Sequence, residues 1–346
     1  MLNDFMNKKH WLAVLIIAAI LLAFWLRPKA AVETNSSYRL VMGTFARIVA
    51  VAEDSDTAQK CIEAAFEQLQ AVETLMSAHS DSSEISRINR NGYKAPVRVS
   101  KPTFEVLQKS LKFSQKTSGA FDITVGPLED LFRSAKKKGV APSKEQIAKA
   151  KLKVGFQKLK LNERDRTVKF AVDGMKLDLG GIAKGYAIDK AIEALQKGGA
   201  VGGMVDVGGD IRCFGTPRSK SNWLIGLQDP AEIKEGIDTG QPLLVLKLTD
   251  TAVATSGDYR RFFLIKDKKY SHIIDTKSGY SSDKLKSVTV ISQNATDADA
   301  LATAVSVMGA EEGLALIETI PQTEAILILT GSSELMKTSG AGKFIK

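Results

Sequence analysis

The amino-acid sequence predicts a mixed α/β fold: one large globule, with a division into two lobes left open, preceded by a single apolar N-terminal segment. Apolar residues make up 44% and charged residues 25% of the 346 residues, which is typical of soluble globular proteins. Stretches rich in β-branched residues alternate with stretches whose apolar residues recur at helical spacing. After residue 37 no Pro-, Gly- and Ser-rich stretch divides the chain, so we expect residues 38–346 to form one domain.

The N-terminal segment is an uncharged run, WLAVLIIAAILLAFWL, that occupies residues 11–26 between basic residues. A helix of this length spans about 24 Å, slightly less than the roughly 30 Å hydrocarbon core of a bilayer. Trp11 and Trp25 lie near its ends, where interfacial aromatic residues are common. The residues that follow make a poor cleavage site, so for residues 1–29 we favour a membrane anchor over a cleaved signal peptide. Residues 30–37 are expected to form a polar linker.

The elements of the domain follow from residue patterns. Leu40–Val51 is rich in β-branched and apolar residues and predicts one long strand. The apolar residues of Asp56–Met76 recur at helical spacing and predict a helix. We expect further strands at Lys176–Leu179, Gly203–Val207, Leu243–Leu248, Arg261–Ile265, Val288–Ser292 and Ala325–Leu329. We expect further helices at Ile182–Gln196, Asp297–Met308 and Glu311–Thr319.

Two segments combine an aspartate with a glycine pair. In Leu177–Tyr186 (LDLGGIAKGY) a strand, a glycine turn and a helix are expected, and the free N–H groups of a first helical turn attract phosphate. Lys184 adds a positive charge there, although an ordinary turn with a surface lysine explains the pattern equally well. Asp206–Gly209 follows the helix, with Asp210 next. Strand, helix and strand predict a right-handed parallel crossover that places both glycine turns at one sheet edge, where ligands bind.

Two further segments could carry chemistry. Asp299 and Thr303 are four residues apart, so a helix would present both oxygens on one face to a hard divalent cation. Thr296 and Asp299 also fit a capping box, which periodicity alone favours. His272 is one of only three histidines and could accept a proton near neutral pH, although a lone histidine more often has a structural role.

Composition excludes several classes of function. Lys and Arg total 48 against 39 Asp and Glu, a net charge of +9, but basic residues are scattered and not interleaved with aromatic ones. Nucleic-acid binding is therefore disfavoured, whereas an anionic substrate suits the charge. Cys61 and Cys213 are the only cysteines, too few for the usual structural zinc site; a disulfide between them is left open.

Eight motifs together resemble those of the ApbE family, the FAD:protein FMN transferases. The resemblance runs from about Tyr38 to the C-terminus. The motifs, in family order, are Val41–Thr44, Asp81–Asn89, Gly119–Thr124, Leu177–Tyr186, Val205–Asp210, Ser256–Tyr259, His272–Asp275 and Ala295–Thr303.

The resemblance implies a reaction and a set of site residues. FAD would be the substrate and Mg²⁺ the cofactor; FMN would be joined to a threonine hydroxyl of an acceptor flavoprotein, such as a redox-pump subunit, and AMP released. Gly181 (through its carbonyl), Asp299 and Thr303 would hold the metal, and His272 and Asp299 would act at the reacting phosphate. The residues implied for the flavin nucleotide are Met42, His79, Ala120, Phe121, Asp122, Asp178, Lys184 and Ile273; His79 stands where many relatives carry an aromatic residue.

The resemblance also implies a location. The protein would be attached to the bacterial inner membrane, with the catalytic domain on the periplasmic face. Two other functions would use the same residues: an FAD pyrophosphatase, in which water replaces the acceptor hydroxyl, and a non-enzymatic, membrane-tethered flavin-binding protein.

Overall fold

The structure is a computed structural model that describes residues 10–13, 15, 31–230, 233–234, 237–238, 240–257, 262–266, 268–331 and 334–346. Most of the apolar N-terminal run lies outside these residues. Within the described ranges, no helix combines the length and the apolar character needed to cross a bilayer.

A large antiparallel sheet forms the centre of the molecule. In the described part of the chain it has nine strands, in the order β1-β3-β7-β8-β13-β16-β17-β18, and β2 pairs with β3. The strands are β1 Val32–Asn35, β2 Arg39–Val41, β3 Thr44–Ala52, β7 Gly202–Val207, β8 Asp210–Phe214, β13 Ala252–Gly257, β16 Leu285–Ser292, β17 Glu324–Leu329 and β18 Leu335–Lys337.

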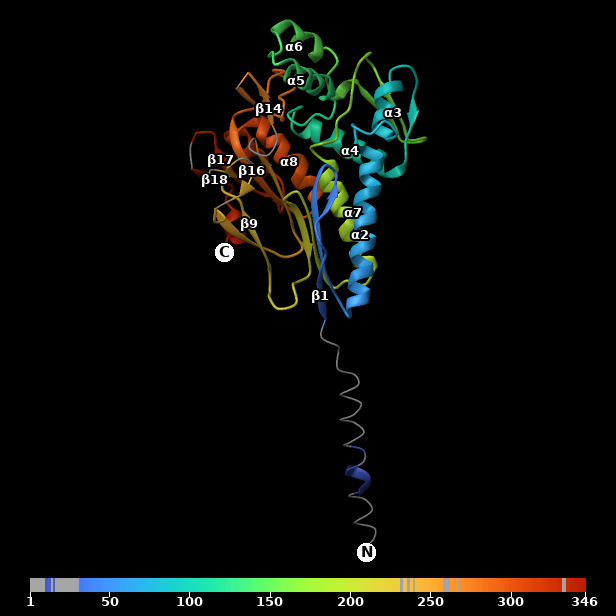
Figure 1. Ribbon diagram of the computed structural model, residues 1–346, viewed down its shortest axis with the longest axis vertical. Helices are drawn as coiled ribbons and strands as arrows, with labels where there is room; N and C mark the ends of the chain where they lie inside the picture. The colour runs from blue at the N-terminus through green and yellow to red at the C-terminus, as the bar shows by residue number, and fades with distance from the viewer. Residues whose placement is uncertain are drawn as a thin grey trace, which may run out of the picture.

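Other elements pack on both faces of the central strands of this sheet. Along β3, Ile48 packs into the core under the helices, while Val49 and Val51 pack on the opposite face against Trp223 and Leu246. This alternation is the period of two that a strand imposes. The helices on the first face are α2 Ser55–Met76, α7 Ala183–Lys197 and α8 Ala295–Met308, of which α2 and α7 lie side by side (Figure 1). The second face carries β9 Trp223–Leu227, β12 Leu244–Leu248 and the 3-10 helix η2 Ala341–Phe344.

Smaller elements surround one end of the sheet (Figure 1). They include a second core, in which Phe132 packs with Leu128, Ile265 and Ile274. The elements there are α3 Glu84–Asn91, α4 Lys101–Lys116, α5 Gly126–Lys138, α6 Lys144–Lys151, η1 Phe156–Lys158, the sheet of β4 Val97–Arg98, β6 Thr167–Phe170 and β5 Leu159–Asn162, and the hairpin of β14 Phe262–Ile265 and β15 Lys268–Ser271. Elsewhere lie α9 Ala310–Glu318, β10 Ile233–Lys234 and β11 Ile237–Asp238.

Two expectations near the first strands are wrong. Leu40–Val51 is not one strand but a hairpin in which Met42 and Gly43 form the turn between β2 and β3. Both have positive φ, 53° and 68°, as two-residue type I′ turns require. Methionine is not a usual turn residue, so the apolar pattern did not reveal the turn. Val32–Asn35, inside the expected linker, form the strand β1, which pairs with β3.

The expected parallel crossover is wrong as well. Lys176–Leu179 does not form a strand and makes only an isolated parallel bridge, between Lys176 and Val125. Gly208 and Gly209 instead form the turn of an antiparallel hairpin, β7–β8, with φ of 64° and 89°. A glycine pair supplies the left-handed conformation that either kind of turn can use, so the sequence pattern did not distinguish them.

The mixed α/β architecture itself is confirmed. The helices expected around α2, α7, α8 and α9 and the strands expected around β7, β12, β14, β16 and β17 are present with shifted ends. The described part of the fold also contains elements that the sequence analysis did not predict, among them the helices α3 to α6 and the central strands β8 and β13.

Candidate active site

The start of α7 places Lys184 at the centre of the site. The chain turns tightly before it, since the Gly180 N–H donates to Asp178 Oδ1 at 2.7 Å. Two N–H groups that were expected to be free for a phosphate are already bonded, those of Ala183 and Gly185. The positive charge that an anionic ligand would meet here is therefore mainly that of Lys184.

The Lys184 ammonium lies between two buried carboxylates. Its Nζ is 3.2 Å from Asp299 Oδ1 and in closer contact with Asp210 Oδ2. Asp210 begins β8, and its other oxygen accepts the Thr255 N–H of β13 at 3.0 Å. Burial lowers the pKa of Lys184, but Asp210 and Asp299 outweigh this and raise it above its ordinary value. Lys184 thus remains an ammonium ion, and one negative charge of the cluster is left uncompensated.

Asp299 faces α7 and does not cap its own helix. The N-cap of α8 is Asn294, whose side chain accepts the Asp297 N–H at 2.9 Å, so the interpretation of Thr296 and Asp299 as a capping box is wrong. Asp299 Oδ2 accepts the Gly185 N–H at 3.1 Å. Burial raises the pKa of Asp299 to about 6, with Lys184 opposing the rise and the nearby Asp210 charge adding to it.

Two glycines allow α7 and α8 to approach each other closely. A Cβ at Gly185 would lie 2.1 Å from the Ala295 carbonyl oxygen. A Cβ at Gly181 would lie 2.8 Å from Thr303 Oγ1. A larger residue at position 185 would have to push α7 away from α8, and one at position 181 would displace the Thr303 side chain. The glycines thus keep Gly181 beside Thr303 and Gly185 beside Asp299.

These contacts bring together Gly181, Asp299 and Thr303, the residues predicted to hold a metal. The Thr303 hydroxyl makes no hydrogen bond within the part of the chain that the structure describes, whereas Ser306 on the same helix donates to the carbonyl four residues earlier. The Thr303 hydroxyl, the buried Asp299 carboxylate and the Gly181 carbonyl are oxygen donors of the kind that a hard divalent cation prefers.

The set provides only part of a coordination sphere. Among the described residues, no group of three or more His, Cys, Asp or Glu side chains could hold a metal by itself. Mg²⁺ characteristically keeps several positions for water and substrate phosphate and binds through one or two carboxylates. The donors here therefore fit a cation that is shared with a phosphate ligand.

The histidine segment lies one helical turn further along α8. Val307 is four residues after Thr303, so both side chains lie on one face of α8. Val307 packs with Ala120 and Ile273 in a small buried cluster. The backbone segment that carries His272, the residue before Ile273, therefore packs beside the face of α8 that presents Asp299 and Thr303.

A sequence model of the ApbE family matches residues 42–327. The chain belongs to the ApbE family. The family assignment expected from the motifs is confirmed.

Relatives cover most of the chain. The FAD:protein FMN transferase of Treponema pallidum is 33% identical over 316 residues, 87% of this chain and 86% of the relative. The FAD:protein FMN transferase of Vibrio cholerae is 32% identical over 314 residues, 90% of this chain and 91% of the relative.

Solved structures of ApbE proteins share the fold. The ApbE protein of Thermotoga maritima matches with a TM-score of 0.80 at 30% identity, over 91% of this chain and 99% of that protein. The flavin transferase ApbE from Vibrio cholerae matches with a TM-score of 0.77 at 29% identity, also over 91% and 99% of the two chains.

In this ApbE family member the segment around Asp122 is stabilised by hydrogen bonds to the Asp122 carboxylate. The Asp122 carboxylate accepts both the N–H and the hydroxyl of Thr124, at 2.8 and 2.7 Å, and the Phe156 N–H at 2.8 Å. Burial raises the pKa of Asp122 despite these hydrogen bonds. Thr276 ties the histidine segment to the same loop by donating to the Gly119 carbonyl at 3.0 Å. The Asp122 side chain thus shapes the loop, and a ligand would meet mainly its backbone.

The other predicted flavin residues lie in different settings. Phe121 is buried and packs edge-on against Phe113, with ring centroids 6.1 Å apart. Met42 sits in the β2–β3 turn and packs partly against the core under the helices. His79 is exposed in the connection between α2 and α3. Within the part of the chain that the structure describes, no hydrogen bond or ion pair joins these three side chains to Lys184, Asp210 or Asp299.

Asp178 lines a pocket of 210 Å³ between α3 and α5. Charged side chains of both signs surround the pocket, among them Arg90, Arg133 and Glu129. Burial, together with the neighbouring Asp178 carboxylate, raises the pKa of Glu129 well above its ordinary value. The pocket is thus a charged, partly enclosed space that adjoins the start of the glycine turn.

Asn89 ends the motif Asp81–Asn89 and supports the backbone that leads into the glycine turn. Its side-chain amide donates to the Leu177 carbonyl at 3.0 Å, and its oxygen accepts the Leu177 N–H at 2.7 Å. The amide therefore pairs with this backbone as a neighbouring strand would. The motif Asp81–Asn89 pointed to this region, but the partner, 88 residues away, was not deducible from it.

Proposed function

We propose that this protein transfers the FMN part of FAD to a threonine hydroxyl of an acceptor protein in a Mg²⁺-dependent reaction and releases AMP. The observation that carries the proposal is the convergence of Lys184, Asp299, Thr303 and Gly181 between α7 and α8. The flavin-transferase activity implied by the motifs is confirmed by relatives named FAD:protein FMN transferase, which align with most of the chain.

The reaction exchanges one phosphorus–oxygen bond for another. The acceptor hydroxyl oxygen forms a bond to the FMN phosphorus, and the bond from that phosphorus to the bridging oxygen breaks. AMP leaves with the bridging oxygen, and the hydroxyl proton passes to a base or to solvent. Such transfers depend on positioning and charge neutralisation more than on covalent help from the protein.

The Lys184 cluster, together with a bound cation, would supply the positive charge that a pyrophosphate needs. Lys184, held by Asp210, would bind phosphate oxygens through its ammonium group. Asp299, Thr303 and the Gly181 carbonyl would hold Mg²⁺, which when bound stabilises the charge of the departing AMP. Because Asp299 and Asp210 together exceed the charge of Lys184, the site attracts a cation before it attracts a phosphate.

His272 is a candidate proton acceptor beside this site. The segment that carries it is fixed by Ile273 against Ala120 and by Thr276 against Gly119. We assign His272 the role of general base toward the acceptor hydroxyl or of stabiliser of the reacting phosphate.

The location is also part of the proposal. The apolar run of residues 11–26, flanked by basic residues, supports an N-terminal membrane anchor. A catalytic domain on the periplasmic face of the inner membrane would meet acceptors such as subunits of membrane redox pumps.

A transfer assay tests the proposal. The full chain is incubated with FAD, Mg²⁺ and a redox-pump subunit that carries a candidate threonine. An FMN adduct on that threonine, formed in equal amount to AMP and absent when the threonine is replaced by valine, supports the proposal. Free FMN and AMP without an adduct would indicate a pyrophosphatase, and FAD that stays intact with Mg²⁺ present would indicate a binding protein.

A further inference from the structure

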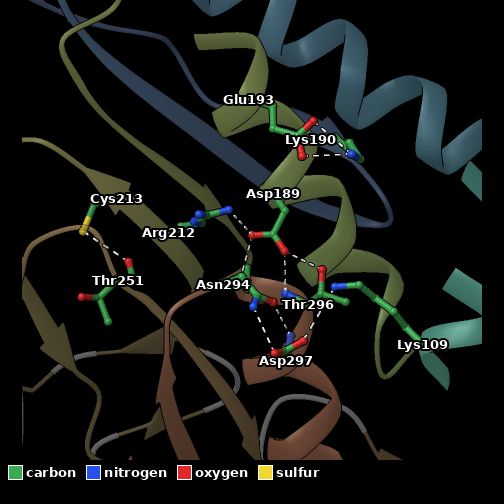
Figure 2. Close-up of polar contacts among 11 residues, drawn as sticks. Lys109, Asp189, Lys190, Glu193, Arg212, Cys213, Thr251, Asn294, Thr296 and Asp297 are labelled. Carbon is green, nitrogen blue, oxygen red and sulfur yellow. Dashed lines mark hydrogen bonds and ion pairs between the residues drawn. The ribbon is translucent and has the colours of Figure 1, made fainter. Parts of the chain in front are cut away.

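Asp189 of α7 is a buried carboxylate that links three elements of the site. It accepts Arg212 Nη1 of β8 at 2.7 Å through Oδ1. The same oxygen accepts the Ala295 N–H at 2.9 Å, and Oδ2 accepts both the N–H and the hydroxyl of Thr296, at 3.0 and 2.5 Å. Figure 2 shows the carboxylate between Arg212 and the start of α8. We call Asp189, Arg212, Ala295 and Thr296 the Asp189 clamp.

The clamp completes the N-terminus of α8. The first N–H groups of a helix lack partners within it. Here Asn294 satisfies the Asp297 N–H through its side chain and the Ala298 N–H through its carbonyl. Asp189 satisfies the two that remain, and its negative charge lies at the positive end of the helix dipole. The first turn of α8 is therefore fixed to α7 by a residue of α7.

The clamp and the metal ligands share one helix–helix contact. Asp189 is four residues after Gly185, and Ala295 is four residues before Asp299, so each pair lies on one helix face. The contact from the Gly185 N–H to Asp299 and the contacts of the clamp are consecutive polar links between α7 and α8. The packing of α7 against α8 thus sets the separation of Gly181 from Asp299 and Thr303, and the hydrogen bonds of Asp189 stabilise that packing.

Strand β8 ties both links to the sheet. Asp210 and Arg212 are two residues apart, so they project to the same face of β8, toward the helices. Asp210 holds Lys184, and Arg212 holds Asp189. Arg212 Nε is buried without a hydrogen-bond partner among the described residues, so the guanidinium takes this position at a local cost. Such costs are typical of functional sites.

We propose that Asp189 is a positioning residue for the metal site: it fixes α8 against α7 at the separation at which Gly181, Asp299 and Thr303 can bind one cation. The inference rests on the proposed function. Mutation of a residue that orients metal ligands without binding the metal itself typically weakens metal binding 10- to 100-fold. We expect the low end of this range, about tenfold, because Asp189 acts through the helices.

The test measures metal binding directly. Mn²⁺, which suits the same oxygen ligands, is titrated into the full chain, and the free ion is followed by electron paramagnetic resonance. Asp189→Asn, which keeps the shape but loses the charge, is expected to weaken Mn²⁺ binding about tenfold. Thr296→Val, which removes only the hydroxyl contact, is expected to give a smaller change of the same sign. The Mg²⁺ concentration for half-maximal transfer should rise in parallel, with little change in the KM for FAD.

Glu324→Gln is the matched control. Glu324 is also a buried carboxylate; it accepts from Thr338 and Lys343 at the start of β17, away from α7. It should lose stability without a change in Mn²⁺ affinity. Wild-type Mn²⁺ affinity in both Asp189→Asn and Thr296→Val, or an equal loss in Glu324→Gln, would overturn the inference. Failure of the wild-type chain to bind Mn²⁺ would instead overturn the proposed metal site, and the inference with it.

Discussion

The Lys184 ammonium and the Asp299 carboxylate lie 3.2 Å apart, although 115 residues separate them in the chain. With Asp210 on the other side, the lysine holds two buried acidic groups together. Without the Lys184 ammonium or another cation between them, the carboxylates of Asp210 and Asp299 would repel each other. This relationship connects the stability of the fold to the charge that the site presents to its substrate.

Lys184→Met should destabilise the protein in a way that Mg²⁺ corrects. Removing one partner of a buried ion pair costs about 3–5 kcal/mol, because the remaining charges are left unpaired. We expect urea unfolding at lower concentrations, with part of the loss recovered when Mg²⁺ binds Asp299. Lys343→Met, which removes a more exposed partner of Glu324, should cost less than about 1 kcal/mol and show no Mg²⁺ effect. A Mg²⁺-independent loss in Lys184→Met would contradict this account.

Asp299→Ala should abolish Mg²⁺-dependent transfer and leave the protein folded. Asn294 caps α8, so the substitution removes no cap, and Lys184 keeps its contact with Asp210. Ser143→Ala offers the opposite pattern, because Ser143 is a true N-cap with a capping box at α6. It should lower stability by about 1 kcal/mol without changing transfer. The rates of adduct formation and the urea midpoints of the two variants test this; a folded Asp299→Ala protein that retains full transfer would remove Asp299 from the site.

Gly185→Ala should separate α7 from α8. The new Cβ would lie 2.1 Å from a backbone carbonyl oxygen, a contact that only movement of a helix can relieve. We expect a loss of about 1–3 kcal/mol, as for other overpacked sites, together with weaker Mn²⁺ binding. Gly342→Ala meets open space and should stay within about 0.5 kcal/mol of the wild-type stability. Wild-type stability and metal affinity in Gly185→Ala would show that the approach of the two helices is not required.

His272→Ala should slow transfer while FAD still binds. The histidine segment is held through Ile273 and Thr276, which the substitution leaves in place. A positioned general base contributes roughly 10²- to 10⁴-fold to a rate, so we expect a fall in kcat in that range. Single-turnover adduct formation and FAD binding by fluorescence separate the two effects. An unchanged single-turnover rate would exclude His272 from the chemical step.

Local patterns predicted much of the fold because they report directly on burial. The helices α2, α7 and α8 and the strands β7, β16 and β17 were found from apolar spacing or β-branched content within a few residues. The turns were harder. Met42 gives no turn signal, and Gly208 with Gly209 suits several turn types, so one hairpin was missed and another was taken for part of a crossover.

The site was predictable in its parts and not in its assembly. Spacing on one helix placed Asp299 and Thr303 on a common face, and the structure agrees. The contact of that face with Lys184 depends on the order of strands in an antiparallel sheet, which no local pattern encodes. Asp189 was missed for the same reason, since its partners lie 23 and 106 residues away along the chain.

Glu129→Gln should change stability in a pH-dependent way. Burial and the Asp178 charge raise the pKa of Glu129 in the folded protein well above its ordinary value of 4.5. Glu129 therefore contributes stability that is fully present below the unfolded pKa and is lost as the pH rises through the folded pKa. Glutamine mimics the protonated form, so the variant should match the wild type near about pH 4 and become relatively more stable toward about pH 8.

Urea midpoints across this pH range give the measurement. Asp178→Asn removes one cause of the raised pKa of Glu129, so in that background the pH-dependent difference between Glu129 and Gln should shrink. A difference that is the same at every pH, or one that grows as the pH falls, would show that the pKa of Glu129 is not raised in the folded protein.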